Sequence, residues 1–208
     1  MKREDKNALS RQRILDAALR EFSEKGYEGA SLNTVWAENG ISKGNIYHHF
    51  KDKDEIYLLC VGSCFDALTE YLGAAEKAAS GTARERSESY FDARLRFFAE
   101  NPLYLGIFSD AAFQPPSALR EDIARCRAGF DALNIAVLTR LLESEPLREG
   151  LSVESIVEDF RLYMDFFNLR FRTEPGRSPE SALREHEARC HRQLDILLHG
   201  VIGEEHDK

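Results

Sequence analysis

A group of polar side chains between residues 31 and 53 has the types and the spacing to contact nucleic acid. Lys43, Asn45 and His48 fall on one face of a short helix predicted over residues 42–49. An Asn side chain suits the edge of adenine and a Lys side chain suits the edge of guanine in the major groove. We therefore expect this helix face to read base edges in double-stranded DNA.

Further residues of the group are placed to hold the backbone of DNA. Ser31 and Ser42 stand at predicted helix N-termini, where free N–H groups and a partial positive charge favour phosphate. Gly44 would let the helix backbone approach DNA closely. Phosphate contacts, which set register rather than sequence, are expected from Tyr47, His49, Lys51 and Lys53. Singly, these residues could equally pack against a neighbouring helix or form a solvated face, but together they indicate DNA binding.

Two short helices joined by a turn must position these side chains. The segments 31–38 and 42–49 flank Gly40, and glycine tolerates the positive φ that such a turn requires. The apolar centre between the two helices is predicted to consist of Val35, Ile41, Ile46 and Phe50. This is the layout of a helix-turn-helix, whose second helix enters the major groove.

Apolar periodicity predicts an all-α fold for the whole chain. Apolar residues recur at steps of three and four, and the alternating β-branched runs that indicate strands are absent. About nine helices are expected, near residues 10–24, 31–38, 42–49, 52–79, 84–99, 102–114, 119–141, 152–171 and 178–201. We expect a three-helix N-terminal helix-turn-helix domain over residues 1–53 and a larger C-terminal helical bundle over residues 54–208.

The charge distribution separates these two parts of the chain. The whole chain has a net charge of −8, whereas residues 1–53 carry +2 and residues 54–208 carry −10. An acidic total therefore permits DNA binding by the N-terminal part. There is no run of about 18 apolar residues, and the charged first ten residues lack the apolar centre of a secretion signal. We expect a cytoplasmic protein without a membrane partner.

The N-terminal quarter of the chain resembles the TetR family of transcriptional regulators. The run from Gly40 to Lys53, Gly-Ile-Ser-Lys-Gly-Asn-Ile-Tyr-His-His-Phe-Lys-Asp-Lys, is similar to the recognition helix of that family and the helix start that follows it. The first helix of the family is similar to Ile14-Leu15-Asp16-Ala17-Ala18 with Phe22 and Gly26-Tyr27. The resemblance implies a repressor that binds operator DNA as a homodimer and is released by a small effector. It also implies groove contacts from Ser31 and Asn33.

Trp36, the single tryptophan, departs from the family pattern. That pattern has a small residue four positions before Gly40, where the two helices cross closely, and a large indole there would overpack the crossing. The helices could be splayed or rotated, the short helix could be offset so that Trp36 faces the first helix or the larger helical domain, or DNA binding could be impaired.

The same resemblance implies that the last two long helices pair with their mates in a dimer. Each carries an apolar stripe, and the expected interface residues are Phe160, Tyr163, Phe167, Leu183, Cys190, Leu194 and Leu197. The alternative is that both stripes are ordinary core of one chain, because part of each stripe must pack inward.

An effector pocket is implied among the helices between residues 54 and 144, which are rich in aromatic residues. Such a lining suits a small, mostly apolar or aromatic molecule, oriented by a few polar groups. The candidate residues are Phe65, Phe91, Arg94, Phe98, Tyr104, Phe108, Asp110 and Phe130, with Arg94 and Asp110 as the polar groups. Each aromatic residue could equally belong to the core.

Two other interpretations are kept. The first is a thiol-responsive or metal-responsive regulator, because two pairs of residues are four positions apart and could each form half of such a site: Cys60 with Cys64, and His186 with Cys190. Neither pair has a clear third and fourth ligand. The other is a helical interaction protein with impaired DNA binding. We do not expect an enzyme or a cofactor, because nucleophile elbow, phosphate-binding loop and HExxH motifs are absent.

Overall fold

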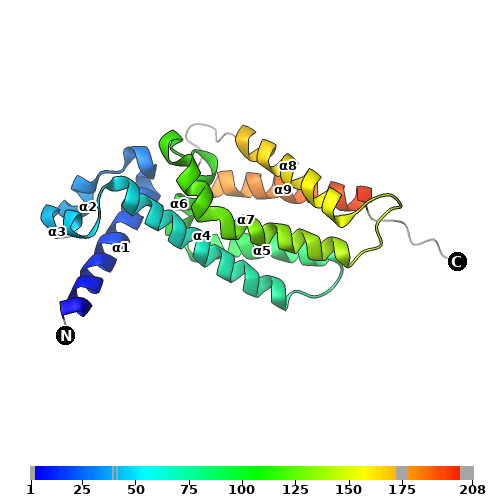
Figure 1. Ribbon diagram of the computed structural model, residues 1–208, viewed down its shortest axis with the longest axis horizontal. Coiled ribbons are helices and arrows are strands. Elements are labelled where there is room, and N and C mark those ends of the chain that lie inside the picture. The colour runs from blue at the N-terminus through cyan, green and yellow to red at the C-terminus, as the bar shows by residue number, and fades with distance from the viewer. Residues whose placement is uncertain (1–2, 39, 41, 172–177, 202–208) are drawn as a thin grey trace. The chain divides into compact units, whose positions relative to one another are not determined.

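The chain folds into helices, as a computed structural model shows for residues 3–38, 40, 42–171 and 178–201, which are the residues that the structure describes (Figure 1). The helices are α1 (Arg3–Gly29), α2 (Leu32–Glu38), α3 (Lys43–His49), α4 (Lys53–Ala78), α5 (Ala83–Glu100), α6 (Pro102–Phe113), the short 3-10 helix η1 (Ser117–Leu119), α7 (Arg120–Glu143), α8 (Val153–Arg170) and α9 (Pro179–Val201). The described residues contain no β-strand, so the predicted all-α class and the predicted helices are confirmed.

The first helix differs most from its predicted range. It begins at Arg3 rather than near residue 10, and it bends at Gly26, whose backbone has φ 65° and ψ 177°. Glycine adopts a positive φ without the clash that a Cβ would cause. The chain therefore changes direction at Gly26 before it enters α2.

Side-chain caps fix several helix starts. Asp52 Oδ1 accepts the Glu55 N–H at 2.9 Å, and the Glu55 carboxylate accepts the Lys51 N–H at 2.7 Å, so the start of α4 is held from both sides. Ser152 and Ser155 form a capping box at the start of α8. Each cap satisfies N–H groups that the first turn of a helix leaves without a partner.

The chain forms two compact units. One consists of residues 1–66 with 101–127, and the other of residues 67–100 with 128–208. The first unit extends beyond residue 53 because α6 packs directly on α1. This division describes packing, and the functional boundary at residue 53 stays a prediction.

The first unit is built around the short helices α2 and α3, which lie next to each other and against α1 (Figure 1). Val35, Ile46 and Phe50 are almost fully buried, as predicted for the centre of the helix-turn-helix. Ile14, on α1, is also fully buried. Ile41, the remaining predicted residue of this centre, lies outside the described residues.

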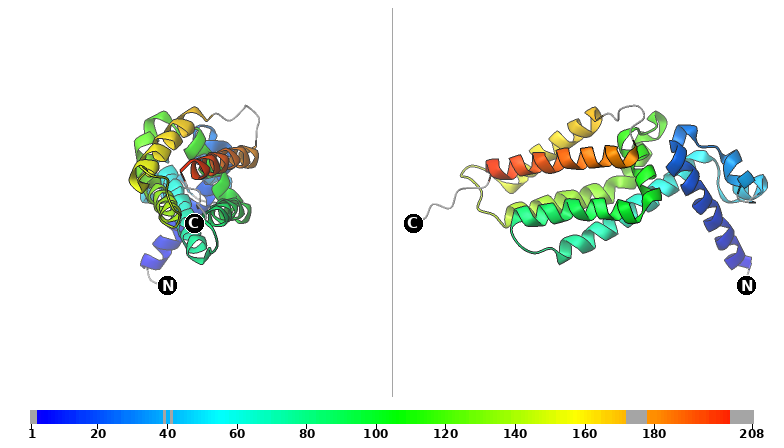
Figure 2. Two further views of the ribbon diagram at one scale, coloured as in Figure 1. Left: turned by 90° about the vertical axis from the view of Figure 1, so that its right-hand side faces the viewer. Right: turned by 180° about the vertical axis from the view of Figure 1, so that it is seen from behind.

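In the second unit, α5 packs against α9 (Figure 2). An apolar cluster joins α7, α8 and α9 through Leu138, Leu142, Ile156, Leu194 and Leu198. Burial of these side chains is the main free-energy term that holds the three helices together.

Among the described helices, α4 is the one long and apolar enough to cross a membrane by length and composition alone. Its apolar side chains are used inside the fold, where those buried are Ile56, Tyr57, Cys60, Val61, Cys64, Phe65, Leu68 and Leu72. Packing in the two cores therefore accounts for the apolar character of this helix.

Candidate functional site

The outer face of the helix-turn-helix is exposed, opposite the buried Val35 and Ile46. Its exposed residues among those predicted to bind DNA are Asn33, Ser42, Gly44, Tyr47, His48 and Lys51. Tyr47 keeps 52% of its surface exposed, which is unusual for a large aromatic side chain. Lys43 and Asn45 belong to α3, but their side chains lie outside the described part of the structure, so their base contacts stay predictions.

Ser31 caps α2, as predicted, and is itself tied to α1. Its Oγ accepts the Asn33 N–H at 3.2 Å, and its own N–H donates to Glu21 Oε1 at 2.9 Å. Glu21 is buried, and Lys25 Nζ lies 2.9 Å from Glu21 Oε2. Burial acts to raise the pKa of the Glu21 carboxyl, but Lys25 and the Ser31 amide outweigh it and lower that pKa. Glu21 therefore stays ionised and anchors the start of α2.

The sequence analysis missed Glu21, although the sequence contains a signal for it. Glu21 lies seven residues after Ile14 and three after Ala18, on the stripe of α1 that faces the core. A charged residue in such a stripe is buried with a partner, because an unpaired buried charge costs several kcal/mol.

The predicted phosphate-binding residues stand at the end of α3 and the start of α4. The Lys53 ammonium lies 4.5 Å above the centre of the Tyr27 ring, which restricts where this cation can reach. His49 is half-buried, and burial together with the charges of His48 and Arg11 lowers its pKa. His49 is therefore uncharged at neutral pH and suits a hydrogen bond better than an ion pair with phosphate.

Trp36 is partly buried on α2. The almost fully buried positions near it are taken by Val35 and Ile46. The indole of Trp36 is therefore not fully enclosed between the two helices.

The residues predicted for the dimer interface pack mostly inside their own chain. Leu183, Cys190 and Leu194 are almost fully buried, so they face the core of the second unit and are not free to meet a second copy. Phe160 and Leu197 pack against the same apolar cluster. Tyr163 stacks on Phe167, with their ring centres 6.1 Å apart. Large apolar side chains that are exposed on these two helices, among the described residues, are instead Leu162, Phe166 and Ile196.

The residues predicted for the effector pocket are divided between the two units. Phe65, Tyr104, Phe108 and Asp110 belong to the first unit, and Phe91, Arg94, Phe98 and Phe130 to the second. Phe65, Phe98, Phe108 and Phe130 are buried, as expected of core residues. Whether any of these residues contacts an effector stays a prediction.

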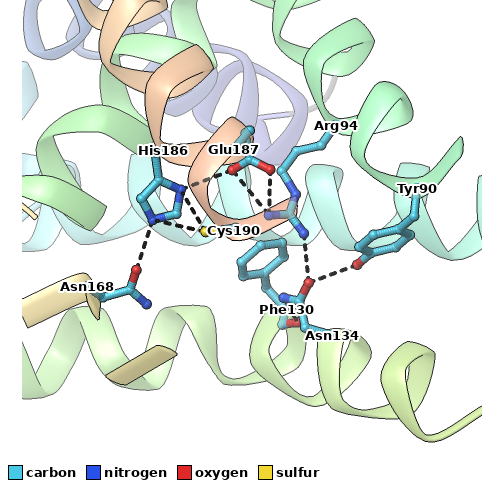
Figure 3. A network of polar contacts seen from close by, with 8 residues as sticks. All are labelled: Tyr90, Arg94, Phe130, Asn134, Asn168, His186, Glu187 and Cys190. Carbon is cyan, nitrogen blue, oxygen red and sulfur yellow. Dashed lines mark hydrogen bonds and ion pairs between the residues drawn. The ribbon is translucent and has the colours of Figure 1, made fainter. Parts of the chain in front are cut away.

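Arg94 is the centre of a buried polar network in the second unit (Figure 3). Its Nη1 donates to Glu187 at 3.0 Å and 3.2 Å, and its Nη2 donates to Asn134 Oδ1 at 2.7 Å. Glu187 also contacts His186, whose second ring nitrogen lies 2.9 Å from Asn168 Oδ1. This chain of contacts connects α5, α7, α8 and α9.

Aromatic rings surround the Arg94 guanidinium. Its central carbon lies 5.3 Å, 5.5 Å and 5.1 Å from the ring centres of Tyr90, Phe91 and Phe130. Arg94 Nε is buried and has no hydrogen-bond partner among the described residues. A buried donor in this condition carries a desolvation penalty that a further acceptor would remove.

The four cysteines have the properties of core residues. All four are free, and Cys60, Cys64 and Cys190 are buried. Burial raises the pKa of each of the four thiols, to about 12 for Cys60. The thiolate is the reactive and metal-binding form. In the described residues, no group of three or more His, Cys, Asp or Glu side chains is arranged to hold a metal. The raised pKa values keep these cysteines mostly in the protonated thiol form, which disfavours a thiol-responsive site.

The fold and the exposed polar face define a helix-turn-helix protein, and its N-terminal region matches known transcriptional regulators. Residues 14–60 match the model for bacterial regulatory proteins of the tetR family. The biofilm operon negative transcriptional regulator IcaR of Staphylococcus epidermidis is 37% identical over 62 residues, 30% of this chain and 34% of that protein. The transcriptional repressor AcnR of Corynebacterium efficiens is 48% identical over 54 residues, 26% of this chain and 29% of that protein.

Solved structures match over much more of the chain. A putative tetR family transcription regulator from Shewanella superposes with a TM-score of 0.60 at 18% identity, over 94% of this chain and 99% of that one. The regulator FadR of Bacillus subtilis, solved with stearoyl-CoA, gives a TM-score of 0.60 at 19% identity, over 91% and 98%. At such low identity these two matches concern the fold.

Residues 14–60 therefore form a DNA-binding region of the tetR family type. The resemblance noted in the sequence is thereby confirmed. The matched region spans about a third of the length of the curated relatives, and it is the region that contains α2 and α3.

Proposed function

We propose that this protein is a cytoplasmic transcriptional regulator, a repressor that binds operator DNA as a homodimer and leaves it when a small effector binds. The observation that carries the proposal is the exposed polar face of α2 and α3 over a buried Val35–Ile46–Phe50 centre. Its relatives IcaR and AcnR, named a negative regulator and a repressor, match over this region. A helix presented in this way enters the major groove.

Fluorescence anisotropy on DNA from upstream of the protein's own gene tests the proposal, with scrambled DNA as the control. Replacing Lys43 and Asn45 together by alanine is expected to lower operator affinity by about 30-fold or more, because each good base contact contributes about 1–3 kcal/mol. Raising the salt concentration should weaken binding of the unaltered protein steeply, since phosphate contacts release counterions.

The matched control is Lys77→Ala, which removes an exposed lysine from the other end of α4. It should leave operator affinity unchanged. The affinity of the unaltered protein should also be measured for fragments that cover neighbouring promoters. If none of these fragments, including the one upstream of its own gene, binds more tightly than scrambled DNA, the protein is not a sequence-specific regulator, and a helical interaction protein is favoured.

The dimer in this proposal uses the outer faces of α8 and α9. Leu162 and Phe166 are one turn apart on α8 and keep 54% and 58% of their surface exposed, and Ile196 on α9 keeps 57%. Exposed large apolar side chains on neighbouring helices are typical of a surface that a partner covers. A twofold dimer also presents two recognition helices to two half-sites.

Phe166→Glu is expected to raise the dimer dissociation constant by about 100-fold, because it removes a large apolar contact and introduces a charge into the interface. Sedimentation velocity over a concentration series measures this change. Leu9→Glu is the matched control, since Leu9 is also 54% exposed but lies on α1. A Phe166→Glu protein that dimerises as tightly as the Leu9→Glu protein would show that the interface lies elsewhere.

The effector in this proposal is a small, mostly apolar or aromatic molecule, and Arg94 is the group best suited to orient it. The surrounding rings provide apolar contacts, and the Nε of Arg94 provides a donor without a partner in the described residues. The effector would favour a state whose recognition helices are wrongly spaced for the operator. DNA must then weaken effector binding by the same factor, so release from the DNA complex is a suitable screen.

A further inference from the structure

Asp110 on α6 makes its contacts with α1 and α4 of the first unit. The two helices α1 and α6 approach very closely beside it, because a Cβ placed on Gly106 would lie 2.3 Å from the main-chain oxygen of Ser23. Asp110 follows Gly106 by one helical turn, so its carboxylate is carried to the bend at Gly26. This location was not foreseen, since the sequence suggested a pocket residue.

One oxygen of Asp110 holds two elements together. Oδ2 accepts the main-chain N–H of Tyr27 at 2.9 Å and the hydroxyl of Tyr57 at 2.7 Å. Tyr27 is the first residue after the bend, and Tyr57 is fully buried on α4. The other oxygen covers the bend itself, because a Cβ on Gly26 would lie 2.7 Å from Asp110 Oδ1. The carboxylate thus fixes the point where the chain turns from α1 toward α2.

The contacts continue from Tyr27 to the predicted DNA-binding residues. Its hydroxyl donates to Asp54, which raises the pKa of the Tyr27 phenol to about 12, with burial as the second cause. The ring of Tyr27 lies under the Lys53 ammonium and packs edge-on against Tyr57, with ring centres 5.0 Å apart. Four residues after Tyr27 the chain reaches Ser31, the cap of α2.

The Asp110 carboxylate is kept in surroundings that do not favour its charge. Burial raises its pKa, and the hydrogen bonds from Tyr57 and Tyr27 act in the opposite direction without cancelling that effect. The geometry that it imposes is therefore the better explanation for a carboxylate at this place than a gain in stability.

We propose that Asp110 is a positioning residue for DNA binding, which sets the direction of the chain from α1 into the helix-turn-helix by holding the Tyr27 amide and the Tyr57 hydroxyl on one oxygen. The inference rests on the proposed function of the protein. A recognition surface must be held close to its productive geometry by surrounding residues, so a small error at this bend displaces α2 and α3 together.

The test compares Asp110→Ala with Asp110→Asn. Both hydrogen bonds end on the same oxygen, so the single carbonyl oxygen of asparagine can accept both, whereas alanine accepts neither. We expect Asp110→Ala to lower operator affinity by about tenfold and to reduce the preference for operator over scrambled DNA, with Asp110→Asn close to the unaltered protein. Asp92→Ala, at an exposed position on α5, is the matched control.

A second readout does not depend on DNA. Hydrogen exchange of the peptide that contains Tyr27 to Ser31 should be faster in Asp110→Ala and unchanged in Asp110→Asn. If Asp110→Ala does not fold, Tyr57→Phe takes its place, because it removes one of the two bonds and keeps the ring.

The outcomes separate the two proposals. If the unaltered protein shows no operator preference, the proposed function is wrong and the role of Asp110 in DNA binding falls with it, whereas hydrogen exchange still tests whether Asp110 holds the bend at Gly26. If the unaltered protein binds operator specifically but a folded Asp110→Ala protein binds equally well, the positioning role is wrong and the regulator stands. Equal losses of operator affinity in Asp110→Asn and Asp110→Ala would also overturn the positioning role, because the hydrogen bonds from Tyr27 and Tyr57 would then not be the cause of the loss.

Discussion

Replacing Arg94 by methionine is expected to lower the free energy of unfolding by about 3–5 kcal/mol, because it strands a buried carboxylate. Glu187 is 2% exposed and has Arg94 as its closest cation, with Nη1 and Oε2 3.0 Å apart. Denaturant unfolding followed by circular dichroism measures the loss. The control is Arg184→Met on α9, which breaks an exposed pair with Glu180 and should cost well under about 1 kcal/mol.

The pH dependence of the Arg94→Met protein identifies the cause of its loss. In the unaltered protein, burial acts to raise the pKa of Glu187, but Arg94 and His186 outweigh it and lower that pKa. The stability that Glu187 contributes is therefore present above its unfolded pKa and is lost as the pH falls through its folded pKa. Without Arg94, burial would raise the pKa instead. The deficit of Arg94→Met relative to the unaltered protein should therefore shrink as the pH falls.

A second variant separates the stranded charge from lost packing. Replacing Arg94 and Glu187 together by methionine removes both charges and should recover most of the loss, because apolar replacements of a buried pair are often neutral or better. A double variant as unstable as Arg94→Met would mean that packing around the aromatic rings, and not the charge of Glu187, dominates.

Gly106→Ala is expected to destabilise the protein by about 1–3 kcal/mol, even though alanine favours helix by about 1 kcal/mol over glycine. The new methyl group would lie 2.3 Å from the main-chain oxygen of Ser23 and 2.4 Å from its Oγ. A main-chain atom cannot rotate away, so α6 must move off α1. Thermal and denaturant unfolding measure the change.

Gly129→Ala is the matched control for that substitution. Gly129 also lies inside a helix, α7, but a Cβ there meets no atom within 4 Å. This variant should therefore be stabilised by up to about 1 kcal/mol. The prediction is that the free energy of unfolding falls in Gly106→Ala and does not fall in Gly129→Ala. A Gly106→Ala protein as stable as Gly129→Ala would show that α1 and α6 separate easily.

The helix-turn-helix was predictable because its information is local. Val35, Ile46 and Phe50 lie within sixteen residues of sequence, and their spacing alone places them on one inner side. The exposed polar face then follows from the helical period. Helix starts at Asp52 and Ser152 were predictable for the same reason, since a cap and its partner are three residues apart.

The partners of polar residues were not predictable, because they are distant in sequence. Asp110 meets Tyr27 across 83 positions, and Arg94 meets Glu187 across 93. A polar residue among aromatic residues suggested a pocket in both cases, but a pattern in one helix does not say which other helix it faces.

The predicted dimer residues show a related limit of periodicity. The stripe containing Leu183, Cys190 and Leu194 was recognised correctly as apolar, and it faces the core of its own chain. The exposed apolar residues, such as Phe166, stand outside the strongest stripe. Periodicity finds the face with the most apolar residues, and that face is buried first.

The position of Trp36 makes the protein suited to optical study. It is the single tryptophan of the chain, it lies on α2, and it is only partly buried. Indole emission depends on the polarity and mobility of its surroundings, and excitation at the red edge of its absorption band avoids the tyrosines. With that excitation, the intrinsic fluorescence of the unlabelled protein originates from the helix-turn-helix, and the other helices contribute no signal.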